Sequence, residues 1–125
     1  MSPSNRDVEG SHSVESSLGR ITISSEAVAQ IVGRVAAESY GVVAMASRSP
    51  LPKLLARDRL TQGITVRGSD EGLRIDLHVV VEYGLNLAEV AASVRSRVGY
   101  EVARLTGLPV AAVEVHVDDV RRSSA

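Results

Sequence analysis

Three ionisable residues near the C-terminal end of the chain have the types and spacing to do chemistry. In the run "VAAVEVHVDDV", Glu114, His116 and Asp118 alternate with valines. A β-strand sends alternate side chains to opposite faces, so the run predicts one apolar face and one face with an imidazole between two carboxylates. Imidazole nitrogens and carboxylate oxygens bind zinc and related metals, and a metal-bound water can be activated for hydrolysis.

A second histidine lies in the longest strand signal of the chain, "GLRIDLHVVVEYG", at residues 72–84. Asp76 and His78 occupy its polar positions, so His78 and His116 would share a face if the two strands are neighbours. That arrangement gives one alternative, a metal-binding or hydrolytic site around His78 and His116. The chain has no paired-histidine spacing such as HExxH, and alternation alone places polar residues on the wet side of a sheet. We therefore predict a solvated face with no catalytic residue, no cofactor and no metal.

Composition limits the remaining choices. The chain has 125 residues with 44% apolar content, enough for one domain around one core. It has no cysteine, phenylalanine or tryptophan, so the core must be aliphatic and disulfides are excluded. The formal net charge of -1 supplies no overall attraction to nucleic acids or anionic membranes.

The elements that must position these residues follow from hydrophobic periodicity. Strands are predicted at 19–24, 42–46, 63–68, 72–84 and after Pro109, and amphipathic helices at 25–39 and 87–106. Strands 63–68 and 72–84 read as an antiparallel hairpin, Ser24 or Ser25 can cap the first helix, Asn86 can cap the second, and Gly107 ends it. The order β-α-β-β-β-α-β predicts an α+β fold. We expect a two-layer sandwich: a mainly antiparallel sheet of about four to five strands with both helices on one face.

The two ends of the chain are polar. Residues 1–18 are rich in serine and charge and predict a disordered tail, in which His12 has no role. Residues 19–120 are predicted as a single domain and 121–125 as a C-terminal tail. No apolar run resembles a signal peptide or approaches the roughly 18 residues of a membrane-spanning helix, so we expect a cytoplasmic protein without direct membrane insertion.

The segment "SRSPLPKLLARDRLTQG" interrupts the pattern with a basic, leucine-bearing patch. Its candidate partner-binding residues are Arg48, Lys53, Leu54, Arg57 and Arg59. They could meet an acidic protein or a membrane surface. The alternative is a connecting loop whose leucines cover the edge of the core while its charges stay in water.

Three short motifs carry a resemblance to a known family. They are "GRITIS" at the start of the first helix, "YG" after the long strand, and "TGL" before an alternating valine strand. Residues 19–120 resemble the alkaline shock protein family, also called the Gls-type envelope stress response proteins of Gram-positive bacteria. The loop at 47–61 matches this pattern least.

The resemblance implies a small, cytoplasmic, non-enzymatic protein connected with cell-envelope stress. Some members of the family are held at the inner face of the membrane by a membrane-anchored partner, and the family has no catalytic motif to carry over. A chain without a lipidation signal needs such a partner to lie at a membrane. We therefore expect a protein-binding scaffold module, peripheral at the inner face of the cell membrane.

A nucleic-acid-binding module is the other alternative. It would use the basic loop 48–59 and a set of exposed arginines, which are Arg95, Arg97, Arg104, Arg121 and Arg122. Against it, Tyr83 is the only aromatic residue near the long strands, and alternation puts it on the apolar side.

Unguarded edges of the strands at 19–24 and 63–68 also predict a homo-oligomer.

Overall fold

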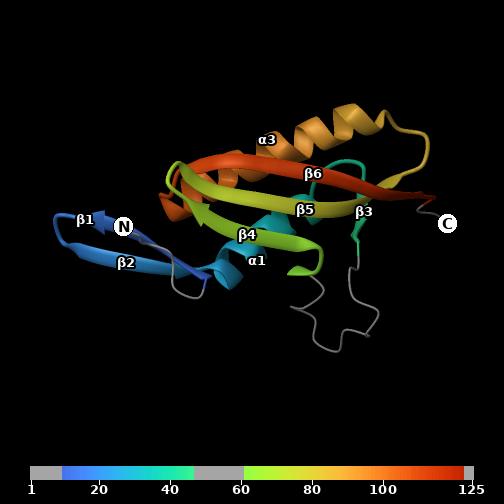
Figure 1. Cartoon of the computed structure of the whole chain (residues 1–125). Helices are drawn as coiled ribbons and strands as arrows, with labels where there is room; N and C mark the ends of the chain where they lie inside the picture. The colour runs from blue at the N-terminus through green and yellow to red at the C-terminus, as the bar shows by residue number, and fades with distance from the viewer. Residues whose placement is uncertain (1–9, 47–60, 123–125) are drawn as a thin grey trace.

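The computed structural model describes residues 10–46 and 61–122. In chain order the elements are β1 (Ser11–Ser16), β2 (Gly19–Ser24), α1 (Ser25–Ala37), β3 (Val42–Met45), β4 (Ile64–Ser69), β5 (Gly72–Glu82), α3 (Leu87–Thr106) and β6 (Val110–Arg121). Strands β3 to β6 form one sheet, the main sheet, and both helices lie against the same side of it (Figure 1). The predicted α+β fold with two helices is confirmed.

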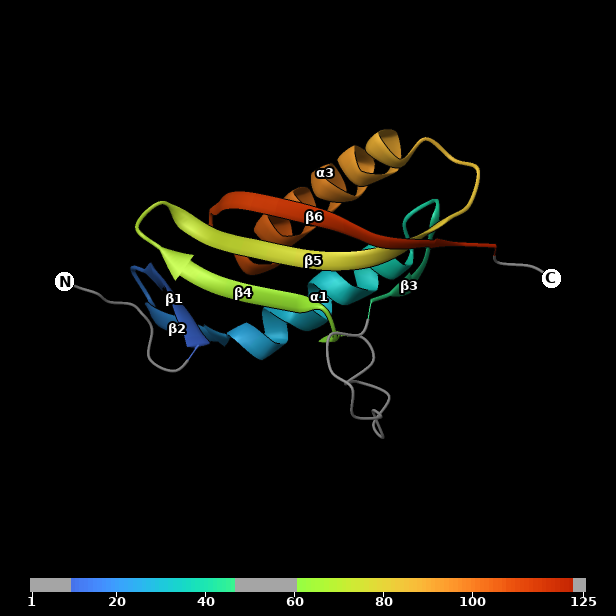
Figure 2. The same cartoon turned by 45° about the vertical axis from the view of Figure 1, so that its right-hand side comes forward.

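Strand β5 is the centre of the main sheet because three strands pair with it. On one edge, β4 pairs antiparallel with its first half and β3 pairs antiparallel with its second half. The two meet at His78, whose N–H donates to Gly63 O at 2.9 Å and whose carbonyl accepts from Ala46 N at 3.0 Å. On the other edge β6 pairs parallel along nearly the whole strand, and α3 makes the crossover that a parallel pair requires (Figure 2).

The core follows from the alternation of β5. Its helix-facing side chains, each at most 2% exposed, are Leu73, Ile75, Leu77, Val79 and Val81. Valines of the two helices cover them, and five are fully buried: Val28, Val32, Val94, Val98 and Val102. Burying each such side chain contributes about 1.5–3 kcal/mol. This aliphatic core fixes the face of the sheet on which the helices pack.

The predicted helix ends are confirmed. Ser24 accepts a hydrogen bond from Ala27 N at 3.0 Å and caps α1, and Asn86 accepts one from Glu89 N at 3.0 Å and caps α3. Gly107 ends α3 with a φ of 76°, a left-handed conformation that glycine adopts without strain.

The N-terminal segment differs from the prediction. Residues 11–16 were expected in a disordered tail, but they form β1 and pair antiparallel with β2, with Val14 opposite Ile21. The strand at "GRITIS" forms as predicted, yet it pairs with β1 in a separate two-stranded hairpin and not with a strand of the main sheet. Val14 and Ile23 pack against the core and hold the hairpin to the domain. With one aliphatic residue, β1 shows too little periodicity to be found from sequence.

Some side chains expected to face inward are exposed. Tyr83 is 55% exposed, because β5 ends at Glu82, and its ring lies 4.6 Å from the Arg122 guanidinium. The helical spacing of apolar residues at 87–106 also predicts that Leu87 and Leu105 face inward, but they are 40% and 54% exposed, since they lie in the end turns of α3.

The end-to-end arrangement of β3 and β4 can be tested at Gly63. A Cβ there would lie 2.5 Å from Ala46 O, and the φ is 76°. Gly84, with a φ of 100°, has nothing within 4 Å and is the matched control. We expect both alanine substitutions to lose about 1–2 kcal/mol through backbone strain. Gly63→Ala should lose roughly 1–3 kcal/mol more through the clash. Urea unfolding measures both, and equal losses would contradict the junction.

Candidate functional site

The ionisable residues of β5 and β6 meet on the face of the main sheet opposite the helices. We call this the polar face, defined by Arg74, Asp76, His78, Glu114 and His116. The parallel register places Asp76 opposite Glu114 and His78 opposite His116. The two histidine rings stack with centroids 4.3 Å apart and planes 11° apart. The expectation that these histidines share a face if their strands are neighbours is therefore confirmed.

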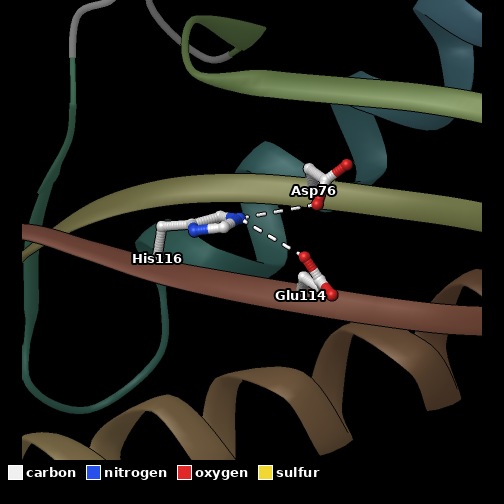
Figure 3. Close-up of side chains that lie close together, drawn as sticks. All are labelled: Asp76, Glu114 and His116. Atoms are coloured by element: carbon white, nitrogen blue, oxygen red, sulfur yellow. Dashed lines mark hydrogen bonds and ion pairs between the residues drawn. The ribbon is translucent and has the colours of Figure 1, made fainter.

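His116 points between the two carboxylates (Figure 3). Its Nε2 atom lies 3.5 Å from Asp76 Oδ1 and 3.7 Å from Glu114 Oε1. Both distances exceed those of well-formed hydrogen bonds, so the contacts are mainly electrostatic. Arg67 adds a guanidinium nitrogen 3.8 Å from Asp76 Oδ2. The cluster places one imidazole nitrogen and two carboxylates together and is open to solvent, since 67% of the Glu114 side chain is exposed.

His78 is held by a carboxylate of its own. Its Nδ1 atom lies 3.0 Å and 3.1 Å from the two carboxylate oxygens of Asp118. Because the His78 ring is fixed in this way and stacks on His116, it limits how the His116 ring can turn.

A β-bulge brings Asp118 into this position. The register moves from Val79 opposite Val117 to Val80 opposite Asp119, so Asp118 is the additional residue on β6. The sequence carries the signal, since two consecutive aspartates separate Val117 from Val120 and break the alternation of valines. Sequence reasoning placed Asp118 on the polar face but did not find the bulge.

His12 is a residue whose place sequence reasoning missed. It was assigned no role in a disordered tail, but it is 7% exposed on β1 and its Nε2 lies 2.8 Å from Ser25 Oγ at the start of α1. The burial lowers the pKa of His12 below its usual value. His12 therefore helps to fasten the hairpin to the domain.

A groove runs between α3 and the outer edge of β6. Its volume is about 650 Å³, and its lining residues are Arg95, Gly99, Ala103 and the β6 residues 110–114. Gly99 and Ala103 carry the smallest side chains on this side of α3, which makes room beside the strand. An adjoining hollow of about 240 Å³ continues past Ala91 to His116.

The backbone of β6 is open toward the outside of the sheet. Leu73 N–H donates to Pro109 O and Tyr83 N–H donates to Arg121 O, both at 2.9 Å, so the odd-numbered residues of β5 face β6. In a parallel pair, the residue opposite a position whose N–H and C=O face the partner strand points its own N–H and C=O away from that strand. Val113 is opposite Ile75 and Val115 is opposite Leu77, so both point these groups away from β5. Among residues 10–46 and 61–122, β6 pairs with β5 alone.

Three of the five arginines proposed for nucleic-acid binding have polar partners within the protein. Arg97 donates to Ser39 Oγ at 3.3 Å, Arg104 donates to Glu101 Oε1 at 2.6 Å, and Arg121 lies 3.8 Å from Asp119. The charges of Arg104 and Arg121 are thus partly offset by carboxylates. The candidate partner-binding residues Arg48, Lys53, Leu54, Arg57 and Arg59 lie outside the described residues, so their role stays a prediction.

Neither described helix is long and apolar enough to cross a membrane.

Comparison with known proteins identifies the family. The model of the alkaline shock protein 23 family, described as having a cell envelope-related function, matches residues 13–122. The chain belongs to this family, as its sequence motifs predicted.

Similar proteins are found in Bacillus subtilis and Streptococcus pyogenes. The Bacillus subtilis protein YloU is 36% identical over 107 residues, covering 82% of this chain and 89% of YloU. The Streptococcus pyogenes protein Spy1614 is 32% identical, covering 82% of this chain and 88% of Spy1614. A protein named stress response regulator gls24 homolog, also from S. pyogenes, is 26% identical, and the match covers 82% of this chain but 59% of that protein. No solved structure matches the chain.

The burial of His12 makes stability depend on pH in a defined direction. Since the pKa of His12 is lowered in the folded chain, the unfolded chain takes up this proton more readily. The folded state should lose stability as the pH falls through the unfolded value of about 6.5. His12→Gln should reduce that loss, measured by urea unfolding between about pH 7.5 and 5.5. An unchanged pH dependence in the variant would contradict the burial of this ring.

Proposed function

We propose that the chain is a non-enzymatic protein-binding module of the cell-envelope stress response, and that a membrane-anchored partner brings it to the inner face of the membrane. Its family supports a role at the envelope, and its similarity to a protein named stress response regulator gls24 homolog supports a role in stress. The observation that carries the proposal is the open edge of β6 beside the groove against α3.

An open strand edge is a binding surface for an extended segment of another protein. Its outward N–H and C=O groups can hydrogen-bond to an added strand, while neighbouring pockets select side chains. Strand β6 contains no proline, and its run from Val110 to Val117 precedes the bulge. Partner contacts are therefore proposed along residues 110–117.

The groove supplies the selectivity in this proposal. Gly99 and Ala103 leave space for side chains of the added strand, and Arg95 and Glu114 place opposite charges along the lining. An incoming segment with alternating apolar and charged residues fits such a surface. The predicted homo-oligomer would place a strand of a second copy on an exposed edge of this kind.

A steric block in the groove tests this surface. Ala103 lines the groove and is exposed, so Ala103→Arg should fill it while leaving the core intact. Ala92, also exposed on α3 and not part of the lining, gives the matched control Ala92→Arg. We expect Ala103→Arg to weaken partner affinity about tenfold or more, a loss of about 1.4 kcal/mol in binding free energy, and so to reduce partner recovery from crosslinked membrane fractions. Ala92→Arg should bind as the unmodified chain does.

Equal recovery of the partner by both variants would show that the partner does not bind in the groove. Thermal unfolding of each variant shows whether a loss of binding reflects the groove or a loss of fold.

A further inference from the structure

We propose that Asp76, Glu114 and His116 form a binding site for one transition-metal dication of the zinc type. The site adjoins the surface proposed for the protein partner, because Glu114 also lines the groove and His116 borders the hollow next to it. It would give the polar face a specific ligand.

The spacing of the ligand atoms supports a single ion. One nitrogen or oxygen from each of the three side chains lies within 4.8 Å of the others, and His116 Nε2 is 3.5 Å and 3.7 Å from its two neighbours. Zinc bonds to nitrogen and oxygen at about 2.0–2.2 Å, so adjacent ligands of a tetrahedral ion are roughly 3.3–3.6 Å apart. The observed distances are long for hydrogen bonds but close to this spacing.

The charges favour a cation between these side chains. Asp76 and Glu114 are directly opposite each other on neighbouring strands, where two like charges destabilise a sheet. Both carboxylates approach one imidazole nitrogen. A dication bound there would offset both negative charges, and Arg67 offsets one of them at 3.8 Å when the ion is absent.

The supporting residues restrict the His116 ring. His78 stacks on it at 4.3 Å and is itself held by Asp118. In metal sites, such outer contacts orient the ligands and raise affinity. We therefore assign His78 a positioning role.

The donor set selects the class of metal. One imidazole nitrogen with two carboxylate oxygens suits zinc, nickel, cobalt and manganese, whereas calcium and magnesium prefer sites made of oxygen ligands alone. With three protein ligands, the fourth tetrahedral position is left for water, and the exposed Glu114 side gives the ion access.

Zinc binding to the purified, tag-free full chain tests the site. Titration calorimetry with Zn²⁺ should give one equivalent per chain. His116→Ala and Glu114→Gln should each weaken binding by more than about tenfold, since even loss of a supporting group weakens metal sites 10- to 100-fold. His78→Ala should weaken binding and keep one equivalent. In NMR spectra, one equivalent of zinc should shift the His116 ring signals.

Two controls separate this site from other groups on the chain. Asp119→Asn changes an exposed carboxylate on the same strand, and His12→Gln changes a histidine far from the cluster in sequence. Both should bind zinc as the unmodified chain does. The proposal is overturned if the unmodified chain shows no saturable binding at one equivalent, or if His116→Ala and Glu114→Gln bind as tightly as the controls. Neither result bears on partner recovery, so the two proposals fail independently.

Discussion

The hydrogen bonding of β5 along both of its edges is the constraint on which the rest of the structure depends. Two short strands share one edge and one long strand takes the other. Since β5 alternates strictly from Leu73 to Val79, pairing it in this register decides at once which side chains enter the core and which reach the polar face. A slip of one residue would bury Asp76 and His78 and expose Leu77.

The choice of a parallel partner has consequences for binding. A parallel β6 needs a crossover, and α3 then packs across the sheet and beside the outer edge of β6. The groove and the open edge arise from this one connection. On the other side of the same strand pair, the parallel register sets His78 against His116 and Asp76 against Glu114. Both proposed surfaces are thus products of how β5 and β6 are joined.

Much of this could be predicted from residues. The alternation of "LRIDLHVVVEY" and the capping residues Ser24, Asn86 and Gly107 were sufficient for the long strand and the helix ends, because these are local signals. The placement of His78 and His116 on one face also followed from alternation, given neighbouring strands.

What the sequence did not reveal depends on long-range pairing. The order of strands decides that β2 is excluded from the main sheet, that β1 forms at all, and that His12 becomes buried. Strand β1 has too few apolar residues to show a period, so its partner determines its structure. The groove is likewise formed by two segments far apart along the chain, and the small side chains of Gly99 and Ala103 acquire meaning only beside β6.

Amide hydrogen exchange along β6, followed by NMR on the isolated chain at low concentration, tests the open edge most directly. The account predicts alternating protection: the amides of Glu114 and His116 exchange slowly because they face β5, while those of Val113 and Val115 exchange fast. On binding a protein partner, Val113 and Val115 should become protected. Uniform slow exchange along β6 in the isolated chain would contradict an open edge and, with it, the proposed binding surface.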